Sequence, residues 1–180
     1  MKHIFNLVLS GAVALSIGCQ QEPENEGADE YFLGTASVRI NDEYFTFKAN
    51  VSKAFEIDSA FNLYCVLQDE YGQLRKSISC SVFNLSEGKQ PINSDLHFPR
   101  RFPSAFYGTL LSDGDVAGSF YNLNETDSIA DYIQITSYNA QTREIKGILR
   151  GSYMVSHIDY DPAAPDSVVV NCVFETVIAE

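Results

Sequence analysis

The chain has 180 residues, enough for one domain with a full hydrophobic core. Its 24 Asp and Glu residues outnumber its 12 Lys and Arg residues, which gives a formal net charge of −12 at pH 7. A surface of this sign repels phosphate backbones, so we expect no nucleic-acid partner.

The first 18 residues combine a lysine, an apolar run and a small residue before a cysteine. Residues 4–17 have no ionisable side chain. The length of this uncharged run suits a signal peptide and is too short for a helix that crosses a bilayer. Gly18 directly precedes Cys19. Lipoprotein signals usually have a leucine three residues before the cysteine, whereas in this chain the leucine, Leu15, is four residues before it. We predict a lipoprotein signal peptide over residues 1–18 and a lipid on Cys19 that anchors the protein to a membrane. The alternatives are an ordinary secretory signal and an uncut anchor.

Residues 19–30 are rich in acidic side chains and contain Pro23, Gly27 and no aliphatic residue beyond Ala28. Such a segment cannot bury enough apolar surface to fold. We therefore predict a flexible tether over residues 19–30, followed by a single all-β domain over residues 31–180.

From residue 31 onward, apolar and polar residues alternate in short runs separated by turn residues, which predicts strands joined by hairpins. The first two runs flank Asn41-Asp42, a favoured two-residue turn. Pairing about this turn places a set of apolar side chains on one face. The set is Ala36, Val38, Ile40, Phe45 and Phe47.

The next hairpin is expected to turn at Gly72-Gln73, with Gly72 at positive φ. Counting outward from this turn sets Cys65 opposite Cys80. For an exported protein this register is compatible with a disulfide between Cys65 and Cys80 or with buried free thiols. The third cysteine of the domain is Cys172, and the spacing of the three matches no zinc pattern, so we predict no metal and no cofactor.

Residues 86–104 form the longest break between predicted strands. Aromatic and basic side chains concentrate in this break and directly after it, on a chain that is otherwise acidic. One interpretation is a rim loop that contacts a glycan or an envelope protein. The other is a lid whose phenylalanines close one end of the core. The candidate binding residues are Phe98, Arg100, Arg101, Phe102, Phe106 and Tyr107.

Two further hairpins and a closing strand complete the domain. Gly147 and Gly151 interrupt the last long arm and indicate bulges or a coil where the sheet bends. The predicted fold is an antiparallel β-sandwich or flattened β-barrel of about nine strands, built from successive hairpins. The hairpins comprise residues 105–112 with 116–122 and 131–138 with 143–157, and the closing strand buries Val168, Val170, Cys172, Phe174 and Ile178.

Reaction chemistry is not recognisable in the sequence. His97 and His157 are the histidines beyond the signal, and no Gly-x-Ser-x-Gly motif is present. Aspartates cluster in two predicted loops but lack the calcium-loop pattern, and turn chemistry explains them. We predict no catalytic residue. A small hydrolase stays a third hypothesis, because a carboxylate pair can meet only in the fold.

Three passages resemble the small surface lipoproteins of Bacteroidota that carry one all-β domain of unknown function. Residues 38–47 are similar to the family's opening "aXiNGxxFxa", with Asp42 where the family often has glycine. Residues 132–138 with 143–147 resemble its "I-T-x-Y-D…I-x-G-x-F" hairpin, and residues 170–175 its closing strand. The resemblance implies an outer-membrane location, on the periplasmic or extracellular face, and no established catalytic residues.

The sequence thus predicts an outer-membrane lipoprotein whose domain is a non-catalytic binding or interaction module at the cell surface. The alternative is a structural envelope or fimbrial component that assembles through its edge strands.

Overall fold

The computed structural model describes residues 31–55, 57, 59–94, 103–111, 116–126, 131–158 and 163–179. These residues form ten β-strands, and none of them builds a helix long and apolar enough to cross a membrane. The strands are β1 (Gly34–Ile40), β2 (Glu43–Lys53), β3 (Phe61–Gln68), β4 (Leu74–Phe83), β5 (Gly88–Pro91), β6 (Ser104–Leu110), β7 (Ala117–Leu123), β8 (Tyr132–Tyr138), β9 (Glu144–Ile158) and β10 (Ser167–Ala179).

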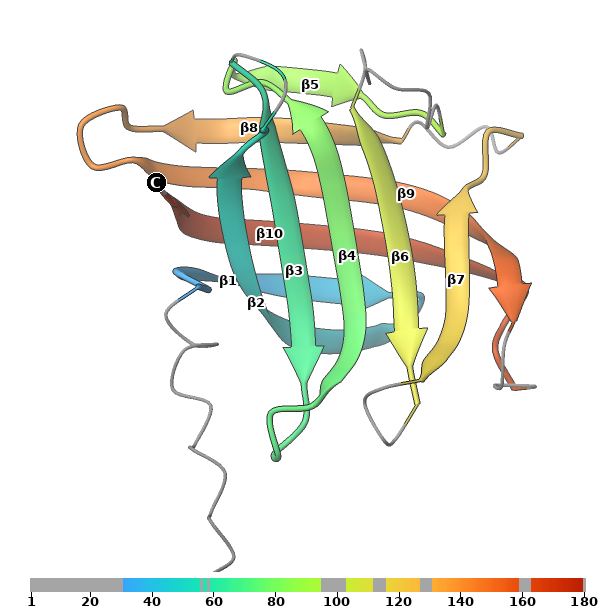
Figure 1. Cartoon of the computed structure of the whole chain (residues 1–180). Helices are drawn as coiled ribbons and strands as arrows, with labels where there is room; N and C mark the ends of the chain where they lie inside the picture. The colour runs from blue at the N-terminus through green and yellow to red at the C-terminus, as the bar shows by residue number, and fades with distance from the viewer. Residues whose placement is uncertain are drawn as a thin grey trace, which may run out of the picture.

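Eight of these strands close into a barrel. Around the ring the order is β1, β10, β9, β7, β6, β4, β3, β2 and back to β1. Neighbours are antiparallel, apart from a short parallel contact in which Ile178 and Ala179 pair with Val51 and Ser52 beyond the start of β1. In Figure 1, β2, β3, β4, β6 and β7 form the near wall, while β1, β10 and β9 run across behind them. The closed ring decides for a barrel and against the sandwich alternative.

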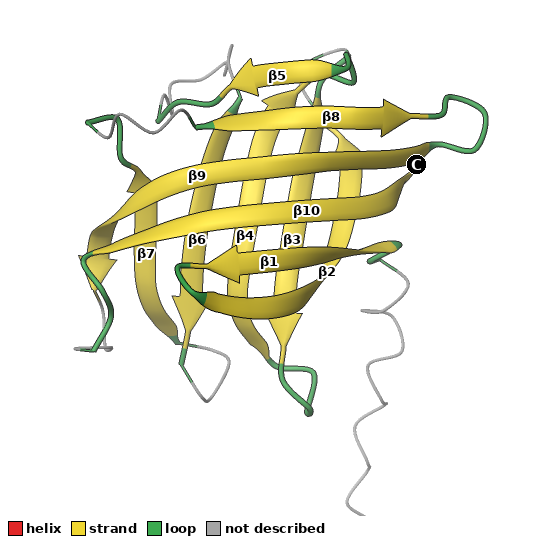
Figure 2. Ribbon diagram, turned by 180° about the vertical axis from the view of Figure 1, so that it is seen from behind, coloured by secondary structure: helices red, strands yellow, loops and turns green. Residues whose placement is uncertain are grey.

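The remaining two strands, β8 and β5, extend the far wall beyond the barrel (Figure 2). One edge of β9 pairs with β10, and the other edge pairs with two strands, β8 and β7. Its first half, from Ile145 to Arg150, pairs with β8, and its second half, from Tyr153 to Ile158, pairs with β7. β5 then adds to the free edge of β8. β5 lies inside the predicted break at residues 86–104, and it raises the strand number above the nine expected.

The barrel interior is filled by the inward-facing side chains of each strand. The face predicted for the first hairpin is confirmed, since its apolar residues are buried or packed against the core and β1 pairs with β2 about a two-residue turn. The predicted face of β10 is buried as well. Alternation of apolar and polar residues therefore identifies the inner face of these strands correctly.

The irregularity predicted around Gly147 is present on one edge of β9, where the register against β8 shifts between the pairs Ile135–Gly147 and Ser137–Lys146. On the other edge, β9 and β10 pair in unbroken register past Gly147 and Gly151. Each glycine also leaves room for an aromatic ring. A Cβ atom on Gly147 would lie 2.4 Å from the ring of Phe174, and one on Gly151 would lie 2.5 Å from the ring of Tyr153. Close approach of rings to the strand explains the glycines.

The register of β3 and β4 also differs from the prediction. Cys65 lies opposite Ile78 instead of Cys80, a shift of two residues. The cause is a longer turn, in which the Asp69 carboxylate accepts hydrogen bonds from the backbone N–H groups of Tyr71 and Gln73, both at 2.9 Å. Gly72 does take a positive φ, of 77°. Because side chains alternate with a period of two, the even shift preserves the inner face.

Candidate functional site

The structure describes two of the predicted binding residues, Phe106 and Tyr107. Outside the described residues lie the predicted lipidation site, Cys19, and the other predicted binding residues, Phe98, Arg100, Arg101 and Phe102. Phe106 and Tyr107 lie in strand β6, which confirms the strand predicted over residues 105–112, and they are therefore not part of a rim loop. The half-buried ring of Phe106 lies 5.6 Å from that of Phe120. Tyr107 points inward, is 2% exposed, and lines a cavity.

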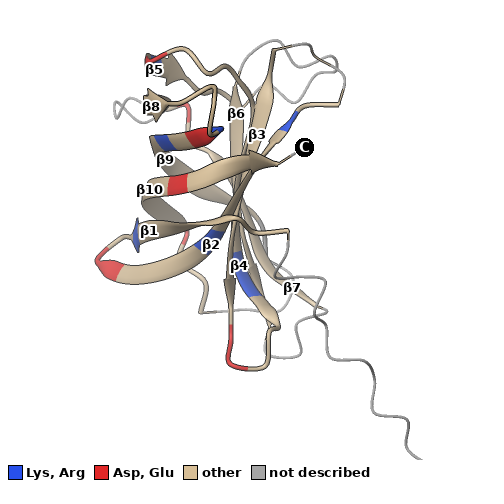
Figure 3. Ribbon diagram, turned by 90° about the vertical axis from the view of Figure 1, so that its left-hand side faces the viewer, with Lys and Arg blue, Asp and Glu red and all other residues tan. Residues whose placement is uncertain are grey.

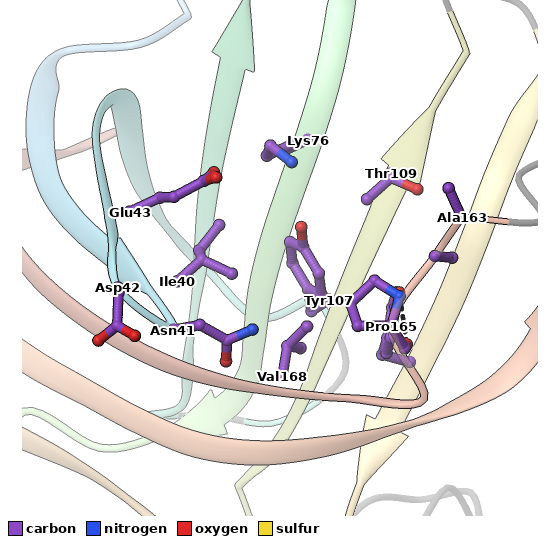
Figure 4. A pocket seen from close by; sticks show the side chains of 12 residues that line it. Ile40, Asn41, Asp42, Glu43, Lys76, Tyr107, Thr109, Ala163, Pro165 and Val168 are labelled. Atoms are coloured by element: carbon purple, nitrogen blue, oxygen red, sulfur yellow. Dashed lines mark hydrogen bonds between the residues drawn. The ribbon is translucent and has the colours of Figure 1, made fainter.

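This cavity, of about 350 Å³, lies at the barrel end where the β1–β2 turn approaches the segment before β10 (Figure 4). We call it the mouth cavity. Residues from six strands and two connecting segments converge on it. Its lining consists of Ile40, Asn41, Asp42, Glu43, Lys76, Tyr107, Thr109, Tyr121, Ala163, Ala164, Pro165 and Val168.

The β1–β2 turn is fixed at the rim of the mouth cavity by Asn41. Its backbone N–H donates to the carbonyl of Val169 at 2.8 Å, and its side-chain Oδ1 accepts from the backbone N–H of Val169 at 2.9 Å. Asn41 has a φ of 52°, a left-handed conformation that asparagine tolerates better than most residues. The anchored turn presents Asp42 and Glu43 at the rim.

Two tyrosines form the inner part of the mouth cavity. The rings of Tyr107 and Tyr121 lie 5.2 Å apart. The Tyr121 hydroxyl donates to the carbonyl of Pro165 at 3.1 Å and so ties β7 to the segment before β10. Burial raises the pKa of Tyr107, and the nearby Tyr121 and Glu43 side chains raise it further. Tyr107 thus keeps its proton and can donate a hydrogen bond.

The hydroxyl of Tyr107 points into the mouth cavity (Figure 4) and forms no hydrogen bond with the described residues. A hydroxyl that faces a cavity has water or a bound molecule as its hydrogen-bond partner. A molecule in the cavity could supply that partner.

Lys76 brings a positive charge to the same cavity. Because side chains alternate along a strand, Lys76 lies on the same face of β4 as the inward-facing Ile78 and Cys80. It pairs with Thr109 of β6. Its ammonium lies 5.3 Å from the centroid of the Phe45 ring. No ion pair or hydrogen bond to Lys76 occurs among the described residues. Figure 3 shows basic residues on β4 and acidic residues at the β1–β2 turn.

Thr109 adds a hydroxyl to the polar lining from the β6 side. The Thr109 Oγ1 accepts a hydrogen bond from the backbone N–H of Ser119 at 3.0 Å. The Ser119 hydroxyl is fully buried and has no partner in the described structure. Among the described residues, the lining therefore offers donors and acceptors of both charge signs, but no serine, cysteine or histidine that could form a nucleophile and base pair.

The cysteines lie in the core, away from the lining of the mouth cavity. Cys65, Cys80 and Cys172 are buried free thiols, so of the two outcomes considered for Cys65 and Cys80 the structure has the second. A hydrogen bond with Cys172, together with burial, raises the pKa of Cys65. Burial raises the pKa of Cys80. Thiols with raised pKa values are poor nucleophiles at neutral pH.

Metal ligation has no support in the described part of the chain, where no three His, Cys, Asp or Glu side chains form a group that could hold an ion. Comparison of the chain with protein-family models, with curated proteins and with solved structures gives no match in any of the three.

Proposed function

We propose that this protein is an outer-membrane lipoprotein, anchored through Cys19, and that its barrel is a non-catalytic binding module for a small molecule. The mouth cavity is the binding site. One observation carries this proposal. The Tyr107 hydroxyl and the Lys76 ammonium both reach the cavity without a hydrogen-bonding partner among the described residues. Polar groups placed in this way are the usual means of orienting a bound ligand.

The size of the cavity supports a small ligand. Small-molecule sites have volumes of roughly 300–1,000 Å³. At about 350 Å³ the mouth cavity is at the lower end of that range. It suits one compact molecule better than a lipid chain or an oligosaccharide.

The residues of the lining support binding over catalysis. Tyr107, with its raised pKa, serves as a hydrogen-bond donor and not as a base at neutral pH. The apolar part of the lining, which includes Ile40, Pro165 and Val168, provides contact area without chemistry.

The alternative function, assembly through edge strands, has less support. β5 is the end strand of the described sheet, with only four residues, and it contains Pro91, which has no N–H to donate. The Gln90 side chain exchanges hydrogen bonds of 2.8 and 2.9 Å with the backbone of Asn84 beside it. A short edge strand and a proline both protect a sheet edge from pairing with another chain. The hydrogen bonds to Gln90 also occupy the backbone N–H and carbonyl of Asn84, which are then less available for such pairing.

The test is a thermal-stability screen of the full-length protein against small amino acids, sugars, carboxylic acids and amines. A ligand at 100 times its dissociation constant stabilises the folded state by about 2.7 kcal/mol. We expect at least one compound to raise Tm in the wild type and to lose most of that effect in Lys76→Met.

The matched control is Lys146→Met. Lys146 lies on β9, outside the lining of the cavity, where it pairs with Glu175 at 2.6 Å and both side chains are at least half exposed. This variant removes the same charge from the surface, and the ligand should stabilise it as it does the wild type. Equal loss in both variants, or no stabilising compound at all, would refute the proposed site.

A further inference from the structure

We infer that the ligand of the mouth cavity is a small zwitterion, with an ammonium and a carboxylate group on one compact molecule, as in a free amino acid or a dipeptide. This inference rests on the proposed function and names the class of ligand. Lys76 would bind the carboxylate, and Glu43 would bind the ammonium.

The first argument is the presence of two opposite charges that do not neutralise each other. Lys76 reaches the cavity from the middle of the near wall, on β4, and Glu43 stands at the start of β2, next to the anchored turn. Among the described residues the two side chains form no ion pair with each other or with a third group. A bound molecule therefore meets both charges.

The second argument is that simpler ligands leave one charge unsatisfied. An anion would be attracted by Lys76 but repelled by Glu43 and Asp42 at the same rim, and a simple cation would face Lys76. A neutral molecule would displace water from the half-buried Lys76 and would offer no opposite charge to it or to the exposed Glu43. A zwitterion offers an opposite charge to each.

The third argument is the position of the remaining groups. Tyr107 points its hydroxyl into the same space as the Glu43 and Lys76 side chains (Figure 4), where it can donate a second hydrogen bond to the carboxylate. Ile40 and Val168 form an apolar wall that can take an aliphatic side chain. The cavity volume of about 350 Å³ leaves room for one such molecule.

The experiment is isothermal titration of the full-length protein with the twenty common amino acids, glycyl-L-leucine and glucose, each tested singly. The tightest zwitterion is then compared with its N-acetyl form, which lacks the ammonium, and its amide, which lacks the carboxylate. We expect each modification to weaken binding by about tenfold or more, the usual effect of losing a charged hydrogen bond.

The variants assign each charge. The Glu43→Gln variant should bind the N-acetyl form as tightly as it binds the parent compound, because the partner of the ammonium is gone. The Lys76→Met variant should likewise bind the amide as tightly as it binds the parent compound. The surface variants Glu175→Gln and Lys146→Met should keep both penalties, because their ion pair lies outside the lining. Penalties that persist unchanged in the two cavity variants would overturn the inference.

The outcomes also separate this inference from the proposed function. If glucose binds and Tyr107→Phe weakens it while no amino acid binds, the mouth cavity is a binding site but the zwitterion inference is wrong. If no probe binds, the inference fails and the proposed function loses its support.

Discussion

Asn41 and Val169 exchange two hydrogen bonds across the end of the barrel, at 2.8 and 2.9 Å. The pair continues the ladder between β1 and β10 by one position beyond the last strand residue, with a side-chain oxygen in place of a carbonyl. It therefore fixes the turn that holds Asp42 and Glu43 at the mouth cavity.

Replacement of Asn41 should separate its two contributions. Asn41→Ala loses the side-chain hydrogen bond, about 1 kcal/mol, and places a Cβ-bearing residue without a local hydrogen bond at positive φ, about 1–2 kcal/mol more. Asn41→Gly loses the hydrogen bond but accepts the backbone conformation, so it should be less destabilised than Asn41→Ala. Urea unfolding measures both. Equal stabilities for the two variants would show that the backbone conformation carries no cost.

Val82 is a strained residue, with a φ of 64° where β4 bulges against β3. A β-branched side chain in this region costs on the order of 1–3 kcal/mol. Val82→Asn should relieve part of that cost and raise the free energy of unfolding by up to about 1 kcal/mol.

The control for this change is Val173→Asn, at an exposed position of β10 in regular strand pairing. It should be neutral or slightly destabilising, because asparagine has low strand propensity. If Val82→Asn is the more destabilised of the two, the strain at Val82 is not a source of instability.

The buried tyrosines allow a second matched comparison. Tyr121→Phe removes the hydrogen bond to the carbonyl of Pro165, which should cost about 1 kcal/mol. Tyr153→Phe removes a buried hydroxyl that has no partner in the described structure, so the change should be neutral or stabilising. Chemical denaturation at pH 7 gives both values. The opposite ranking would mean that Tyr153 has a partner, such as a bound water.

Stability should fall in alkaline solution. The pKa values of Cys65 and Cys80 are raised in the fold, whereas an unfolded cysteine titrates near pH 8.5. Above that pH the unfolded chain releases protons that the folded chain retains, so the free energy of the unfolded state falls relative to that of the folded state. The contribution is complete below about pH 8.5 and is lost as the pH rises, with a slope of at most about 1.4 kcal/mol per pH unit and thiol.

Unfolding of Cys80→Ala between pH 7 and 10 measures this effect. The variant should be less stable than the wild type at pH 7, because it leaves a small cavity, but its stability should decline less steeply. Parallel pH profiles for the two proteins would contradict the assignment to Cys80.

The membrane anchor has its own test, the mass of the protein isolated from its native envelope. We predict loss of residues 1–18 and an added acyl mass on Cys19. An unlipidated N-terminus would refute the anchor and leave the argument for the mouth cavity unchanged.

Several features of the fold could be predicted from local sequence, because they depend on neighbouring residues. The Asn41-Asp42 turn and the inner faces of β1, β2 and β10 are of this kind. Closure of the barrel could not be predicted, since it depends on contacts between distant strands, such as β1 with β10. Gly147 illustrates the difference, because its reason is the Phe174 ring on another strand.

The site itself left one usable signal. Lys76 lies on the same strand face as Ile78 and Cys80, and a charged residue is uncommon on a face that packs on the core. Glu43 and Pro165 gave no comparable signal, because exposed turn residues of these types are common.

The measurement that tests the central claim most directly is nuclear magnetic resonance of the full-length protein with ¹³C-labelled tyrosine rings. The chain has 10 tyrosines, and Tyr107 and Tyr121 would be assigned through their phenylalanine variants. On titration with the tightest compound from the stability screen, we predict saturable shifts of these two rings, little change for the exposed Tyr44 and Tyr71, and no saturable shift in Lys76→Met. Shifts at the exposed rings, with Tyr107 and Tyr121 unchanged, would place binding elsewhere and contradict the account.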